Sequence, residues 1–221
     1  MKLLRIGAVL IASAAAIVGL AAPAQAGLGG PAIPWVNGDY TGTYTTASGT
    51  YALDMTITQN GDQLGGQSVQ QGGVLTLTGT VNNKGKVHLV ENGFFTLDGA
   101  KWGDTLLGTW SSFGATGTWQ VTKVPSVRGS YLGSFTINGS PLQGGMNLTV
   151  VQVGGVLGGS MTMGGAAYSN SGTVTTNGVL HIVGLSSAGS RTLNGTQVDP
   201  QDLSGTWWDS TGSGTWSEWT L

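Results

Sequence analysis

Apolar and polar residues alternate along most of the chain with a period of two. Leu53, Met55 and Ile57 are separated by the polar residues Asp54 and Thr56. Successive side chains of a β-strand point to opposite faces, so this alternation predicts half-buried strands rather than helices. The pattern gives about eight strands in the first half of the chain. They lie near 39–45, 50–59, 63–69, 73–80, 86–91, 94–100, 104–110 and 116–122.

The second half of the chain repeats the first. Residues 38–45 (GDYTGTYT) reappear as residues 129–136 (GSYLGSFT), and the similarity continues to the end with spacing that grows only at expected loops. Such self-similarity indicates two homologous units. We place them at 37–123 and 128–221. Because the joint between them is very short, we expect the units to lie close together.

One hairpin can be predicted in detail from its glycine and tryptophan residues. An antiparallel pairing centred after Phe113 sets Gly108 opposite Trp119 and Trp110 opposite Gly117. Each indole is then expected to lie over a glycine, which covers bare backbone and fixes the strand register. The second unit is expected to pair Gly205 with Trp216 and Trp207 with Gly214.

Short antiparallel strands joined in chain order favour closure into a small up-and-down barrel, because closure removes exposed sheet edges. The predicted fold is therefore all-β, with two tandem barrels. A composite sandwich or one larger barrel built from both halves is the alternative. The Gly-Thr-Trp triplets that begin at Gly108, Gly117, Gly205 and Gly214 resemble the calycin group of lipocalin-like and avidin-like barrels. Units of about 90 residues are short for that group, which argues against a roomy interior cup.

Residues 1–26 have the pattern of a secretory signal peptide. Lys2 and Arg5 give a basic start, and an apolar run follows that ends in small residues at Ala26. This run is shorter than a membrane-spanning helix requires. We expect cleavage after Ala26, an irregular leader over 27–36, and a bacterial protein exported to the periplasm or the medium. No integral membrane segment is expected in the mature chain.

Composition excludes several classes of function. The chain has Cys 0, so it cannot form disulfides or thiolate metal sites. Only 8% of its residues are charged, and its net charge of -2 offers no basic stripe for nucleic acid or anionic lipid. The two units share no carboxylate, and no nucleophile elbow is present, so we expect no enzymatic activity and no cofactor.

Five aromatic and imidazole side chains are the candidates for ligand binding. The units do not share Trp102, Trp208 and Trp219, so these indoles are expected outside the common core, where they can stack on a sugar or fill a partner's pocket. His88 and His181 occupy the same place in the two units. We expect no carboxylate at a neighbouring strand position, which favours a structural role for both and no metal site.

Taken together, these features predict a secreted, non-enzymatic binding protein. Its ligand is expected to be a small hydrophobic molecule or a glycan, bound in a barrel interior or on an aromatic surface. The alternative is a structural or adhesive protein whose barrels act through contacts with a cell-surface protein.

Overall fold

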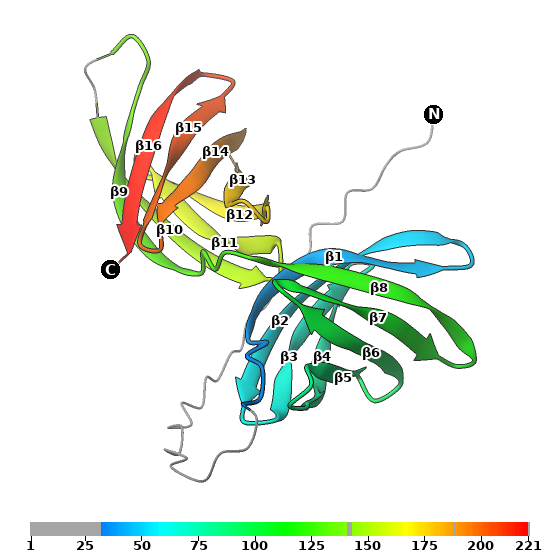
Figure 1. The fold of residues 1–221 in the computed structure, drawn as a ribbon. Coiled ribbons are helices and arrows are strands. Elements are labelled where there is room, and N and C mark those ends of the chain that lie inside the picture. Colours follow the sequence, from blue (N-terminus) through cyan, green and yellow to red (C-terminus); the bar gives the residue numbers. More distant parts are fainter. Residues whose placement is uncertain (1–31, 141–142, 188, 221) are drawn as a thin grey trace.

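A computed structural model describes residues 32–140, 143–187 and 189–220, which form sixteen β-strands (Figure 1). The first eight are β1 (Gly38–Thr46), β2 (Gly49–Asn60), β3 (Gln63–Gln70), β4 (Gly73–Val81), β5 (Lys86–Glu91), β6 (Phe95–Trp102), β7 (Thr105–Ser112) and β8 (Ala115–Val124). The second eight are β9 (Gly129–Thr136), β10 (Gln143–Val153), β11 (Val156–Met163), β12 (Ala166–Val174), β13 (Val179–Ser186), β14 (Gly189–Asp199), β15 (Asp202–Asp209) and β16 (Gly212–Thr220). The expected signal peptide, residues 1–26, lies outside the described residues.

The strands form two closed antiparallel barrels in tandem. Each strand pairs with the next along the chain. β8 pairs back onto β1 to close barrel 1, and β16 pairs back onto β9 to close barrel 2. The prediction of two up-and-down barrels is confirmed, and the alternative of one composite sheet is wrong. Within the described residues, no helix is long and apolar enough to cross a membrane.

Glycines allow the strands to bend sharply enough for closure. A Cβ added at Gly79 would lie 2.0 Å from the backbone oxygen of His88, and one at Gly108 would lie 1.9 Å from that of Asp98. Neighbouring backbones are therefore in direct contact at these points. No other residue fits there, because real Cβ atoms do not approach a carbonyl oxygen so closely.

The predicted hairpin register is confirmed, but one indole differs from the expectation. Gly108 pairs with Trp119 and Trp110 with Gly117, and the indole of Trp110 covers Gly117 as expected. The ring of Trp119 lies instead over Gly99, one strand further along the wall. Its Nε1 atom donates to backbone oxygens on β6 and β7 at 3.2 and 3.1 Å. Close contact between the backbones of β6 and β7 at Gly108 leaves no room for the ring there. The register also matches in barrel 2, at Gly205 with Trp216 and at Trp207 with Gly214.

Each barrel is closed at one end by a residue that precedes its first strand. Val36 is fully buried in barrel 1, although it belongs to the stretch expected as an irregular leader. The Tyr40 hydroxyl donates to the Val36 oxygen at 2.9 Å, and the Val36 amide donates to Gln59 Oε1 at 2.7 Å. Val127 forms the same plug in barrel 2. The Tyr131 hydroxyl donates to the Val127 oxygen at 2.8 Å, and the Val127 amide donates to Gln152 Oε1 at 2.7 Å.

Large side chains fill both lumens. Phe95 stacks on Trp110 in barrel 1 with ring centroids 5.0 Å apart. In barrel 2 Arg191 takes the place of Phe95, and its guanidinium carbon lies 4.6 Å from the centroid of the Trp207 ring. Arg191 Nε also donates to Asp209 at 2.8 Å, so this interior cation is paired. With the lumens packed in this way, a ligand site is better sought on the outside of the barrels.

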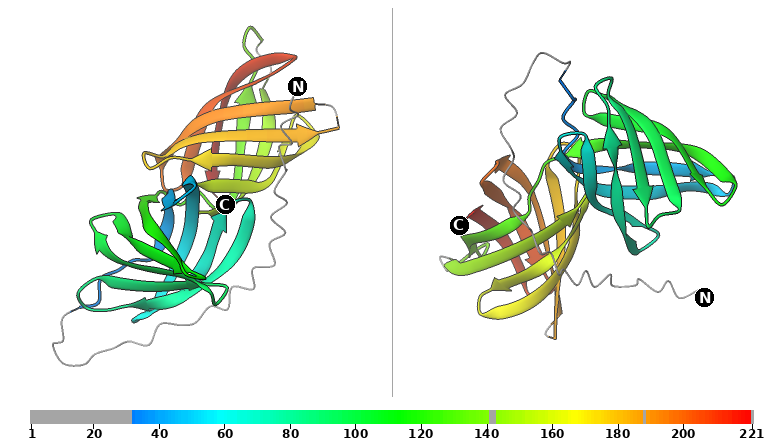
Figure 2. Two further views of the ribbon diagram at one scale, coloured as in Figure 1. Left: turned by 90° about the vertical axis from the view of Figure 1, so that its right-hand side faces the viewer. Right: turned by 90° about the horizontal axis from the view of Figure 1, so that it is seen from below.

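The barrels lie next to each other and contact through the turn between β10 and β11 (Figures 1 and 2). The Gly155 amide donates to Asp54 Oδ1 at 2.9 Å. The conformation of Gly154 brings the backbone against β2, where any side chain would collide with Asp54. Arg128, in the joint between the barrels, forms an ion pair with Asp39 on β1. These contacts hold barrel 2 against β1 and β2 of barrel 1.

We expect the stability of barrel 2 to depend on pH through Glu218. This inward-facing side chain is 1% exposed, neither carboxylate oxygen has a hydrogen-bond partner, and barrel 1 carries Val121 at the same place. Burial raises the pKa of Glu218 from 4.5 to about 8. The folded state therefore keeps a proton that the unfolded chain releases, and stability falls as the pH rises from 4.5 to about 8, by up to about 1.4 kcal/mol per pH unit.

The Glu218→Val variant should remove most of this fall, because it restores the residue type of barrel 1. Urea unfolding at pH 5, 7 and 9 measures the effect, and the gain over the parent should be largest at pH 9. Glu218→Gln, which cannot ionise, should also flatten the pH dependence. An unchanged slope in both variants would show that Glu218 does not control it.

Candidate functional site

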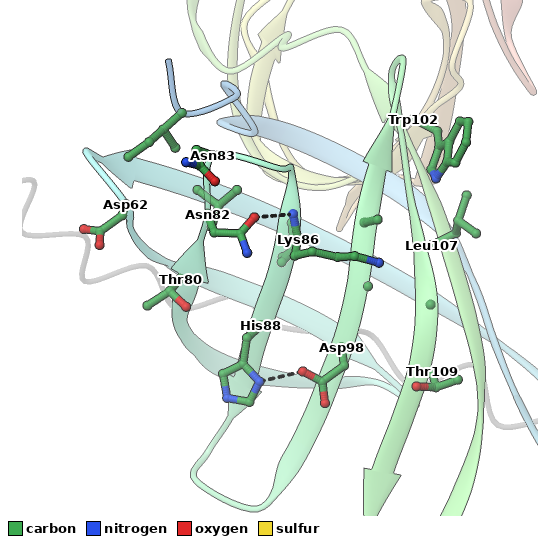
Figure 3. Close-up of a pocket in the computed structure, with 16 residues that line it drawn as sticks. Asp62, Thr80, Asn82, Asn83, Lys86, His88, Asp98, Trp102, Leu107 and Thr109 are labelled. Carbon is green, nitrogen blue, oxygen red and sulfur yellow. Dashed lines mark hydrogen bonds and ion pairs between the residues drawn. The ribbon is translucent and has the colours of Figure 1, made fainter. Parts of the chain in front are cut away.

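A groove of about 1050 Å³ lies on the outer wall of barrel 1, across β4, β5, β6 and β7 (Figure 3). The groove is lined by residues that alternate along these strands with the core side chains. These residues face outward, so the groove lies outside the lumen. Its polar and aromatic lining includes Thr80, Lys86, His88, Asp98, Trp102 and Thr109.

Small residues form the floor of the groove. Gly99 and Gly108 pair across β6 and β7, and the two strands touch there because neither has a side chain. Ala100 continues the floor along β6. The outward-facing side chains next to these residues, Asp98, Leu107 and Thr109, form the sides of the groove.

His88 and Asp98 face each other across β5 and β6. Their side chains meet at 2.7 Å, from His88 Nδ1 to Asp98 Oδ1, and both are more than half exposed (Figure 3). The expectation that no carboxylate neighbours the histidine is therefore wrong. In barrel 2 the amide of Asn194 takes the place of the carboxylate, and its Oδ1 atom lies 2.6 Å from His181 Nδ1. The pairing is common to both barrels, but only barrel 1 has a charge in it.

The three candidate tryptophans lie at different places. Trp102 is 72% exposed at the end of β6 and lines the groove. Trp208 and Trp219 are each 53% exposed, and they lie on β15 and β16 of barrel 2. The structure thus brings His88 and Trp102 into one site and leaves Trp208, Trp219 and His181 outside it. Among the described residues, no group of three or more side chains is arranged to hold a metal ion.

Lys86 and Leu107 also belong to the groove, although the sequence patterns did not single them out. Asn82 Oδ1 accepts a hydrogen bond from the Lys86 amide at 3.0 Å and orders the start of β5. The Lys86 side chain extends over β6 toward the side that carries Trp102 and Leu107 (Figure 3). Comparison of the two units could have found Lys86, because barrel 2 has Val179 there.

Comparisons with known proteins give only distant similarity. No family model and no curated protein matches the chain. Burkholderia oklahomensis agglutinin is 14% identical, with 83% of this chain and 95% of that chain covered and a TM-score of 0.26. A Myxococcus xanthus hemagglutinin, solved with α3,α6-mannopentaose, is 15% identical, with coverage of 82% and 99% and a TM-score of 0.25.

A third solved structure is transferrin binding protein B from serogroup B Neisseria meningitidis. It is 9% identical, with 78% of this chain and 53% of that chain covered and a TM-score of 0.27. Similarity at this level does not assign a function. The calycin resemblance is likewise supported only by the presence of small antiparallel barrels.

We expect Gly108→Ala to damage both the groove and the barrel. Its methyl group would meet the Asp98 oxygen at 1.9 Å, so β6 and β7 must separate, at a cost of about 2 kcal/mol. Gly145→Ala is the matched control, because a Cβ at Gly145 meets nothing within 4 Å. Thermal and urea unfolding of both variants measure the difference. Equal stability of the two would contradict the close contact at Gly108.

Proposed function

We propose that the protein is a non-enzymatic binding protein whose ligand is a glycan, held in the groove on barrel 1. The observation that carries the proposal is an indole, Trp102, exposed at the edge of a groove with a floor of small residues and polar sides. A sugar ring has an apolar face of C–H groups and a rim of hydroxyls. An indole offers a large flat apolar surface to such a face.

The polar sides of the groove suit the hydroxyl rim. Within the described residues, the contact between His88 and Asp98 is the only side-chain hydrogen bond of either residue. His88 Nε2 and Asp98 Oδ2 therefore stay available to sugar hydroxyls. Thr80 and Thr109 add hydroxyl groups that can donate or accept. This lining favours a glycan over the small hydrophobic ligand that the sequence also allowed.

The dimensions of the site favour an oligosaccharide. A second hollow of about 310 Å³ lies on β1, β7 and β8, and it shares Leu107 and Gly108 with the groove. The two hollows together run around the wall of barrel 1 on either side of Leu107. A chain of several sugar rings would use both. Such a role fits a protein exported from the cytoplasm, as residues 1–26 predict.

Replacement of Trp102 should weaken glycan binding. Loss of the indole face removes an apolar contact of about 1.5 kcal/mol or more, so we expect Trp102→Val to bind at least about tenfold more weakly. A glycan array identifies the ligand, and isothermal titration calorimetry with that ligand gives the dissociation constants.

Trp208→Val is the matched control, because it removes another exposed tryptophan, one that lies outside the groove. It should bind like the parent. Loss of binding in Trp208→Val with full binding in Trp102→Val would place the site on barrel 2 instead. Failure of the parent to bind any glycan on the array would reject the proposal.

A further inference from the structure

Phe113 occupies an unusual position at the turn between β7 and β8. It is 89% exposed, and its φ of 47° lies in the left-handed region that bulky residues rarely adopt. Tight hairpins normally place Asn or Gly there. The same turn in barrel 2 is polar, with Ser210 at this place and Asp209 Oδ1 accepting from the amides of Thr211 and Gly212 at 2.7 and 3.0 Å. The fold therefore does not require an aromatic residue at this turn.

A second exposed phenylalanine lies beside it. Phe94, on the turn between β5 and β6, is 52% exposed, and its ring centroid lies 5.5 Å from that of Phe113. We call this pair the phenylalanine tip. It projects from the end of barrel 1 opposite the Val36 plug.

The turns around the phenylalanine tip carry no charge. Residues 46–49, 70–73, 92–94 and 112–115 include no Asp, Glu, Lys or Arg. Glu91, at the end of β5, is fully buried. Charged side chains instead occur at the plugged end of barrel 1, in its turns at Asp62, Lys84 and Asp104 and at the start of β5 at Lys86. The end that carries the tip is thus neutral, polar and aromatic.

We propose that the phenylalanine tip inserts into the interface of a zwitterionic lipid bilayer. Two convex turns that present adjacent rings can enter a bilayer without a preformed pocket, and the uncharged Asn, Gln, Ser and Thr side chains around them can remain among the headgroups. The absence of cations on this end removes any attraction to anionic lipid, so a neutral surface is the better match. Strain at Phe113 without a structural need for it indicates a functional role for the ring.

Association of this kind is weak and reversible. Transfer of one phenyl ring into an apolar environment changes the partition coefficient by about tenfold or more. Two rings together change the partition coefficient by about a hundredfold, which is weaker than a single acyl chain, so binding is measured at millimolar lipid. The glycan groove is lined by residues of the charged, plugged end, including Asp62 and Lys86, so it stays accessible when the tip is inserted.

Flotation of the full chain with phosphatidylcholine vesicles tests the proposal. We expect the parent to float with the vesicles and Phe113→Asn to partition about tenfold more weakly. Asn suits the left-handed turn, so this variant should be at least as stable as the parent, and thermal unfolding checks that a loss of binding does not come from misfolding. The double variant Phe94→Ser with Phe113→Asn should not float.

Trp219→Ala is the control for an exposed aromatic elsewhere, and it should float like the parent. The proposal is overturned if the parent does not float, or if Phe113→Asn floats as well as the parent. It is also overturned if the parent floats only with vesicles that contain phosphatidylglycerol. Because these vesicles carry no glycan, the result does not depend on the glycan groove.

Discussion

Closure of eight short strands into a small barrel is the constraint on which the rest of the structure depends. A wall this tightly curved requires neighbouring backbones to touch, and only glycine permits the contact, as at Gly79 and Gly108. The same curvature leaves a narrow lumen, and Trp110, Trp119 and their neighbours pack in it as a hydrophobic core. The interior is thus used for stability, and the groove lies on the outside of β6 and β7, among the side chains that point away from the lumen.

Comparison of the two barrels shows how the interior can change while the architecture stays the same. Arg191 of barrel 2 takes the place of Phe95 in barrel 1. Its flat guanidinium group packs on Trp207, as the Phe95 ring packs on Trp110. The added charge is compensated by Asp209: although its burial opposes ionisation, hydrogen bonds from Thr211 and Arg191 lower the pKa of Asp209 to about 2. Glu218 has no such partner, so burial keeps it protonated near neutral pH. Interior charge is tolerated in these barrels when it is paired or neutralised.

Much of the fold could be predicted from sequence, because alternation, repetition and glycine–tryptophan pairs are local signals. The candidate site was predicted only in part. The contact between His88 and Asp98 can be predicted only if the register between β5 and β6 is known. The turn between those strands has a third residue, Phe94, after the standard Asn92-Gly93 pair, so a two-residue turn would predict a different register. Val36 follows a stretch rich in glycine and proline, so its burial could not be read from periodicity. Both features depend on contacts across the barrel rather than along a strand.

The internal repeat separates what the fold needs from what it only accommodates. Barrel 2 closes with Val179 in place of Lys86 and with Ser210 in place of Phe113, so neither side chain of barrel 1 is required for closure. An exposed position that the architecture leaves free is the place where selection for binding can act. Barrel 1 combines an exposed indole, the Lys86 cation and a strained aromatic turn on its outer surface, at positions that barrel 2 occupies with aliphatic or small polar side chains. That asymmetry is why we propose that barrel 1 makes the contacts with other molecules, while barrel 2 packs against its wall.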